Sequence, residues 1–124
     1  MAGRRIVLPY APRRVFLPYH NRTQRWSCIV AHRRAGKTVA CLNELQKAAL
    51  LCERERPRFG YVAPYLKQSK SVAWDYMLHY SAPIPGIEVN HSELKVTYPN
   101  GGQVRLWGAD NAEAMRGVYF DGVV

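Results

Sequence analysis

The first third of this 124-residue chain lacks acidic side chains: neither Asp nor Glu occurs before Glu44. Eight arginines fall within the first 34 residues, and the whole chain carries a net charge of +9. Such a stretch suits a polyanionic partner, because each basic side chain that meets a phosphate releases counterions. A solvated basic tail without any partner would have the same composition. Charge alone therefore leaves both interpretations open.

Long apolar runs and cysteines are also scarce. No stretch approaches the length of a membrane span, and the N-terminus lacks the apolar core of a signal peptide. The cysteines are Cys28, Cys41 and Cys52, an odd number whose spacing fits neither a zinc site nor a disulfide framework. We therefore expect reduced, buried cysteines in a cytoplasmic protein that uses no membrane. The length allows one domain with a modest core.

One short motif is present that carries an explicit mechanism. The octapeptide Ala31–Thr38 (AHRRAGKT) fits the phosphate-binding pattern G-x-x-x-x-G-K-[ST], with Ala31 in place of the first glycine. In this pattern, backbone N–H groups at a helix N-terminus surround the phosphates. We therefore predict that the chain binds ATP and Mg²⁺. The alternative is a plain glycine turn between a strand and a helix. The predicted nucleotide-binding residues of the loop are Ala31, Arg33, Arg34, Ala35, Gly36, Lys37 and Thr38.

Three residues of the loop have roles that follow from their chemistry. Lys37 is expected to contact the β- and γ-phosphates, and the Thr38 hydroxyl to bind Mg²⁺. A lysine at a helix start is disfavoured by the positive end of the helix dipole, which supports an anionic partner. Gly36 lets the backbone approach the phosphate closely.

The flanking pattern predicts an α/β fold. Residues 1–25 contain three prolines and are expected to form an extended basic lead-in, and residues 26–124 a partial ATPase domain. Because strands alternate with helices, we expect a mainly parallel sheet with helices on both faces and an inserted β-hairpin. The expected strands are 26–31, 59–63, 94–98, 103–107 and 118–124, and the expected helices are 36–54, 66–80 and a short turn at 111–116.

Smaller features of the C-terminal part have local interpretations. Asp110 and Asn111 are expected to cap the short helical turn, and Gly117 to follow its last residue. Asp121 is expected in mid-strand or at a bulge. A buried strand that stops at Val124 suggests a fragment of a longer protein.

Six segments carry a further signal: His20–Trp26, Ala31–Thr38, Tyr61–Gln68, Trp74–Tyr76, Gly108–Asn111 and Met115–Val124. Together they resemble the ATPase domain of phage terminase large subunits, the motors that package DNA. The similarity covers roughly residues 15–124. It implies the fold of a P-loop NTPase of the RecA-like (ASCE) type.

This resemblance implies further roles and partners. Arg33 is expected to act in catalysis with Lys37, by stabilising charge on the γ-phosphate, unless a neighbouring subunit supplies that arginine. Gln24 is expected to recognise adenine, since a side-chain amide both donates and accepts; a turn or capping role is the alternative. The parent would translocate double-stranded DNA in the host cytoplasm, as a homo-oligomeric ring, with a portal protein and a small terminase subunit.

The chain departs from the family pattern in what it lacks. In related chains the last strand continues into an Asp-Glu pair that positions Mg²⁺ and the attacking water, and a nuclease domain follows. We therefore expect this polypeptide to bind nucleotide without efficient turnover. The alternatives are another P-loop DNA motor such as a helicase, and a non-catalytic basic module that binds nucleic acid.

Overall fold

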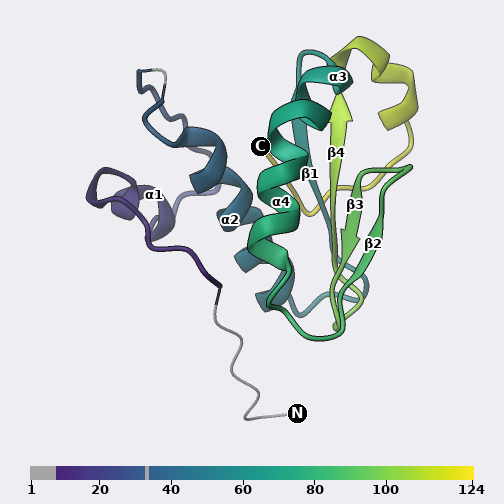
Figure 1. The fold of residues 1–124 in the computed structure, drawn as a ribbon, viewed down its shortest axis with the longest axis horizontal. Helices are drawn as coiled ribbons and strands as arrows, with labels where there is room; N and C mark the ends of the chain where they lie inside the picture. The colour runs from purple at the N-terminus through teal and green to yellow at the C-terminus, as the bar shows by residue number, and fades with distance from the viewer. Residues whose placement is uncertain (1–7, 33) are drawn as a thin grey trace.

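A single sheet of five strands, in the order β2-β3-β4-β1-β5, organises the computed structural model, which describes residues 8–32 and 34–124 (Figure 1). The central strand β1 pairs in parallel with β4 on one side and with β5 on the other. β3 joins β4 and β2 in antiparallel fashion. The strands are β1 Arg58–Ala63, β2 Glu88–Asn90, β3 Lys95–Thr97, β4 Gln103–Gly108 and β5 Gly122–Val123.

Two longer helical segments, α2 and the one that ends in α4, cover one face of this sheet. Their apolar side chains meet those of the strands in one core, in which Leu42, Met77, Val96, Val104 and Leu106 are almost completely buried. The second segment contains a π-helical turn between two α-helical parts. The helical segments are η1 Arg14–Phe16, α1 Leu17–His20, α2 Lys37–Leu51, α3 Leu66–Gln68, η2 Ser69–Ala73, α4 Trp74–Ser81 and η3 Ala109–Met115. No helix in the described ranges is long and apolar enough to cross a bilayer.

The inserted β-hairpin is confirmed. β3 and β4 pair in antiparallel register around a turn in which Gly101 adopts a φ of +84°. The N–H of Tyr98 donates to the Gly102 carbonyl at 2.7 Å, which closes the turn. The Asn100 side chain donates to the carbonyl of Ala49 at 2.8 Å and thereby fixes the turn against the end of α2.

The capping of the short helical turn near the C-terminus differs from the prediction. It is a 3₁₀ segment, η3, that begins after Gly108 with no side-chain cap, so the expected capping role of Asp110 and Asn111 is wrong. The Asp110 carboxylate instead accepts the N–H of Leu66, the first residue of α3, at 3.3 Å. Gly108 permits this contact, since a Cβ there would lie 2.4 Å from that nitrogen. Gly117 follows the last turn with a φ of +81°, as expected.

The segment at 26–31 is not the predicted buried strand. It has no strand assignment, and its side chains Trp26 and Val30 are 81% and 93% exposed. A strand needs a neighbour to take up its backbone hydrogen bonds. Among the described residues the sheet ends at β5, and no strand joins β5 to this segment.

The lead-in is only partly extended. Arg14–His20 is helical, with Pro18 in the first turn of α1, where a missing N–H costs nothing. Phe16 is buried to 3% exposure and anchors the segment. Residues 1–7, part of the same expected segment, lie outside the described residues.

Candidate nucleotide site

The predicted phosphate loop leads directly into the N-terminus of α2. Gly36 is the N-cap residue and adopts a φ of +100°, which favours glycine because it has no Cβ. No side chain caps this helix end. The first N–H groups of an α-helix have no intrahelical acceptor, so an uncapped end offers donors and a partial positive charge to an anion.

Lys37 closes the loop on itself. Its ammonium group donates a 2.8 Å hydrogen bond to the carbonyl oxygen of Ala31, at the opposite end of the motif. Between them, the N–H of Ala35 reaches the His32 carbonyl at 3.3 Å. The loop is therefore a closed turn, in which the Lys37 side chain reaches back to the first residue of the motif.

A small second core supports the loop from behind. It consists of Phe16, Ala35 and Ala40, with Ile29 and Ala31 packed against it. The Arg13 guanidinium donates to the carbonyl of Ala35 at 2.9 Å. The lead-in segment therefore contacts the predicted phosphate loop through the Phe16 ring and the Arg13 hydrogen bond.

A charged cluster ties the same lead-in to α2. The Glu44 carboxylate is 8% exposed, and Arg22, Lys47 and His20 contact it at 2.6, 2.7 and 3.2 Å. The hydroxyl of Tyr10 extends the cluster with a 2.8 Å hydrogen bond to the second ring nitrogen of His20. Burial raises the pKa of Glu44, but hydrogen bonds from Lys47, Arg22 and His20 outweigh it and leave the pKa below its usual value. Glu44 is therefore ionised at neutral pH.

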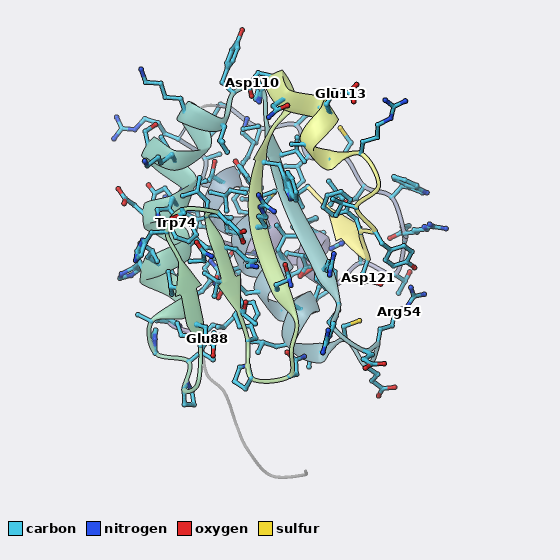
Figure 2. All side chains as sticks on the ribbon, turned by 90° about the vertical axis from the view of Figure 1, so that its right-hand side faces the viewer. Arg54, Trp74, Glu88, Asp110, Glu113 and Asp121 are labelled. Atoms are coloured by element: carbon cyan, nitrogen blue, oxygen red, sulfur yellow. The ribbon has the colours of Figure 1, made fainter. Side chains whose placement is uncertain are left out.

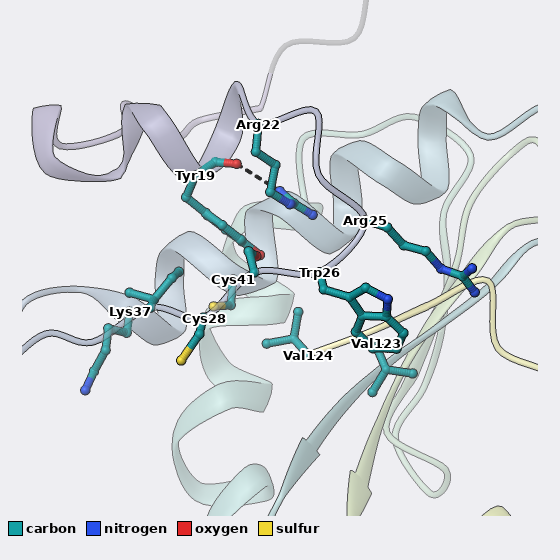
Figure 3. A pocket seen from close by; sticks show the side chains of 11 residues that line it. Tyr19, Arg22, Arg25, Trp26, Cys28, Lys37, Cys41, Val123 and Val124 are labelled. Carbon is teal, nitrogen blue, oxygen red and sulfur yellow. Dashed lines mark hydrogen bonds between the residues drawn. The ribbon is translucent and has the colours of Figure 1, made fainter.

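A cavity of about 420 Å³ lies between the segment before the loop and the end of the sheet (Figure 3). Lys37 and Cys28 line one part of it, and Trp26 lies near Val123 and Val124 in another. Cys41, on α2, also lines it, and burial raises the pKa of its thiol. Cys28 is exposed, contrary to the expectation of buried cysteines.

A second cavity of about 320 Å³ reaches the loop at Gly36. Three tyrosines contribute to its wall, and two of them, Tyr10 and Tyr80, meet edge to face with their ring centroids 6.0 Å apart. Its lining residues are Tyr10, Ala11, Arg13, Phe16, Gly36, Val39, Tyr76 and Tyr80. The cavity therefore places three tyrosine side chains beside Gly36, the residue that precedes α2.

The structure brings most of the predicted site residues together. Ala31, Ala35, Gly36 and Lys37 share the closed loop, Thr38 is half-buried in the first turn of α2, and Arg34 is exposed at a φ of +66°. Arg33 lies outside the described residues.

Gln24 lies apart from these loop residues. It is exposed, its side-chain oxygen accepts the N–H of Thr23 at 3.2 Å, and it lines neither cavity at the loop. No group of three or more His, Cys, Asp or Glu side chains in the described ranges could hold a metal ion. The assignment of Thr38 as a Mg²⁺ ligand stays a prediction.

The sequence interpretation did not anticipate the supporting residues. Phe16, Arg13 and Glu44 position the loop and its lead-in, yet none belongs to the motif. One signal was available for Phe16, an apolar residue in a basic, proline-containing stretch that has little other apolar surface to bury.

Comparison with known proteins gives a structural match. The ATPase domain of the large terminase of Thermus phage P74-26 superimposes with a TM-score of 0.72 and 20% sequence identity, over 94% of this chain and 53% of that one. The R139A mutant of that domain gives a TM-score of 0.70 at the same identity and coverage. No family model and no curated protein matches. This chain spans about half the length of the structures it matches, and over that span it shares the fold of the large terminase ATPase domain of Thermus phage P74-26.

Proposed function

We propose that this chain is the ATP-binding part of a DNA-packaging terminase large subunit. The observation that carries the proposal is the closed loop at an uncapped helix end, with Lys37 turned onto the motif and a left-handed glycine before α2. The likeness to a terminase ATPase domain supports this assignment over a helicase. The full protein would translocate double-stranded DNA into a procapsid, with ATP hydrolysis as its energy source.

The triphosphate fits the residues of the loop. Backbone N–H groups at the start of α2 would hold the phosphates, and Lys37 would exchange its bond to Ala31 for one to a phosphate oxygen. The Thr38 hydroxyl would hold Mg²⁺, which neutralises charge on the phosphates. Arg33 would contribute to catalysis in the full protein. This chain would bind nucleotide with little turnover.

The nucleoside fits the tyrosine-lined cavity better than it fits Gln24. That cavity opens at Gly36, whereas the Gln24 oxygen is engaged by its neighbour Thr23. Removing an aromatic platform from a nucleobase costs about 1–3 kcal/mol. Adenine recognition by Gln24 stays a prediction.

Titration with a fluorescent ATP analogue tests the assignment, with Lys37→Ala as the first variant. Strong loss of affinity in Lys37→Ala is expected, and unchanged affinity would rule out the phosphate-loop assignment. Tyr76→Ala should weaken ATP about tenfold while leaving inorganic triphosphate unaffected. Tyr65→Ala is the matched control, because Tyr65 is similarly exposed but lies outside the cavity.

DNA, the portal protein, the small terminase subunit and a homo-oligomeric ring are the proposed partners. The arginine-rich lead-in supports DNA as the polyanion. DNA affinity should fall steeply with salt. If DNA binding persists in Lys37→Ala and vanishes when residues 1–14 are removed, while nucleotide binding is absent from the unmodified chain, the basic binding module is the correct account.

A further inference from the structure

Trp26 is the most exposed of the three tryptophans of the chain. It is 81% exposed, whereas Trp74 and Trp107 are only 5% and 6% exposed. The Arg25 guanidinium lies over the Trp26 ring, with its central carbon 5.5 Å from the ring centroid (Figure 3). Tryptophan rings are enriched at binding surfaces, because they offer a large apolar area and one polar N–H group. The Trp26 ring is open to a ligand that arrives from solvent.

A second exposed aromatic side chain lies close to this pair. Tyr119 is 64% exposed and lines a cavity of about 330 Å³. Trp26 lines the cavity of about 420 Å³ described above, and Arg25 lines both cavities, which are therefore neighbours. A ligand that extends from one cavity into the other meets both rings and the arginine that the cavities share.

The walls of the two cavities are strongly basic. No carboxylate of the described ranges lies within ion-pair distance of Arg25. Asp121 is the single described acid in either wall, and it is already engaged by Arg54 at 3.0 Å and by the N–H of Arg58 at 2.9 Å (Figure 2). The hydroxyl of Tyr119 accepts a further 2.6 Å hydrogen bond from Arg54. The basic side chains of the walls are Arg22, Arg25, Arg54 and Lys37.

Exposed aromatic rings that alternate with arginines are suited to a single strand of nucleic acid. Each unpaired base can stack on a ring, and the arginine meets the phosphate that joins two bases. A duplex hides the faces of its bases in its own stack, so it cannot use the rings in this way. The two rings and the basic walls therefore favour unpaired nucleotides over a duplex.

We propose that Trp26, Arg25 and Tyr119 form a binding site for single-stranded DNA, such as the unpaired end of a duplex. One base stacks on Trp26, another base of the same strand stacks on Tyr119, and Arg25 contacts a phosphate between them. The site goes beyond the function proposed above, in which the DNA is double-stranded. It does not depend on nucleotide binding at the phosphate loop.

Tryptophan fluorescence of the chain, titrated with a short oligothymidylate, tests the proposal. Saturable quenching is expected, because Trp26 is open to the bases while the other two tryptophans are buried. An abasic oligomer of the same length keeps the phosphates and lacks the bases. It should bind about tenfold more weakly and leave the fluorescence unchanged. A duplex of the same length should also fail to quench.

Variants separate stacking from charge, with the anisotropy of a fluorescein-labelled oligothymidylate as the readout and circular dichroism as the check on folding. Trp26→Ala and Tyr119→Ala should each weaken binding about tenfold. Tyr119→Phe keeps the ring, loses the hydrogen bond from Arg54 and should bind as the unmodified chain does. Tyr65→Ala is the control, because Tyr65 is 58% exposed but lines neither cavity.

Salt dependence tests the arginine. Arg25→Gln should weaken binding and reduce the slope of log affinity against log salt by about 0.7, the value for one phosphate contact of a single strand. Arg56→Gln removes an exposed arginine that lines neither cavity, and it should leave the slope unchanged.

Three results would overturn the proposal. The first is the absence of saturable quenching by oligothymidylate, or equal quenching by the duplex. The second is unchanged affinity in Trp26→Ala, or equal affinity for the abasic oligomer. The third is displacement of the oligomer by ATP together with loss of quenching in Lys37→Ala, because Trp26 would then belong to the nucleotide site. Loss of ATP binding alone in Lys37→Ala concerns the phosphate loop and leaves the strand site in place.

Discussion

The ammonium group of Lys37 is hydrogen-bonded to the carbonyl oxygen of Ala31, 2.8 Å away, across the full length of the phosphate-loop motif. Because this is one hydrogen bond of a half-buried lysine, we expect Lys37→Ala to lower the free energy of unfolding by only about 1 kcal/mol. Urea denaturation measures this value. A much larger loss would mean that reduced nucleotide binding reports unfolding rather than a missing contact.

Thr38 should determine the response to Mg²⁺ and leave metal-free binding unchanged. The half-buried hydroxyl in the first turn of α2 is the predicted metal ligand. In Thr38→Ala, ATP affinity in the presence of Mg²⁺ should fall to the value measured in EDTA. Thr38→Ser keeps a hydroxyl and should retain the Mg²⁺ effect. Equal Mg²⁺ dependence in the alanine variant would remove Thr38 from the metal site.

Replacing Gly36 separates backbone strain from ligand contact. A Cβ at this position would have ordinary contacts, 3.6 Å from the Phe16 ring, so the cost comes from the φ of +100°. Gly36→Ala should lose about 1–2 kcal/mol of stability. Gly117→Ala is the matched control, because Gly117 also has a positive φ and open space around it. Both variants should be destabilised in urea, but only Gly36→Ala should weaken ATP.

The Glu44 cluster predicts a specific acid sensitivity. The folded-state pKa of Glu44 lies below its unfolded value of about 4.3, so the ionised carboxylate stabilises the folded state above that pH. That contribution is lost as the pH falls through the folded-state pKa. Glu44→Gln should lower the free energy of unfolding by about 2 kcal/mol at neutral pH, a value between those for exposed and buried ion pairs.

Denaturant curves at several pH values measure this effect. The stabilities of Glu44→Gln and the unmodified chain should converge as the pH falls through the lowered folded-state pKa of Glu44. Glu93→Gln removes an exposed carboxylate that pairs with Lys95, and it should change stability little. A constant difference between Glu44→Gln and the unmodified chain at all pH values would contradict the ionic account.

The cysteines should differ in their reactivity. The Cys28 thiol is exposed, whereas burial raises the pKa of Cys41 and reduces its thiolate fraction at neutral pH. Alkylation followed by peptide mass spectrometry should therefore modify Cys28 before Cys41. In Cys28→Ser, the rapidly alkylated peptide should disappear and Cys41 should still be alkylated slowly. Faster labelling of Cys41 would indicate that α1 and α2 separate in solution, since Tyr19 lies beside that thiol.

The sequence alone predicted the elements that depend on neighbouring residues or on a periodic apolar pattern. α2 begins within one residue and ends within three of its predicted bounds, because its apolar positions recur at helical spacing. The hairpin followed from Asn100-Gly101, whose turn needs a positive φ. The loop motif predicted the glycine turn at Gly36 before α2 for the same local reason.

Long-range relationships could not be predicted. The segment at 26–31 is as apolar as a strand, but strand formation depends on a neighbour, which composition does not reveal. Asp110 caps α3, 44 residues earlier in the sequence, rather than its own helix. The Glu44 cluster likewise arises from segments brought together by the fold.

The short edge strand β5 has a practical consequence for work with this polypeptide. Val124 exchanges hydrogen bonds with Gly60 and Val62 of β1, and no strand of the described chain pairs with β5 on its other side. The Trp26 ring, which lines a cavity with Val123 and Val124, is 81% exposed. Unprotected edges next to apolar surface promote intermolecular β-pairing. Concentrated samples should therefore self-associate, and a Val123→Lys substitution should keep them monodisperse in light scattering.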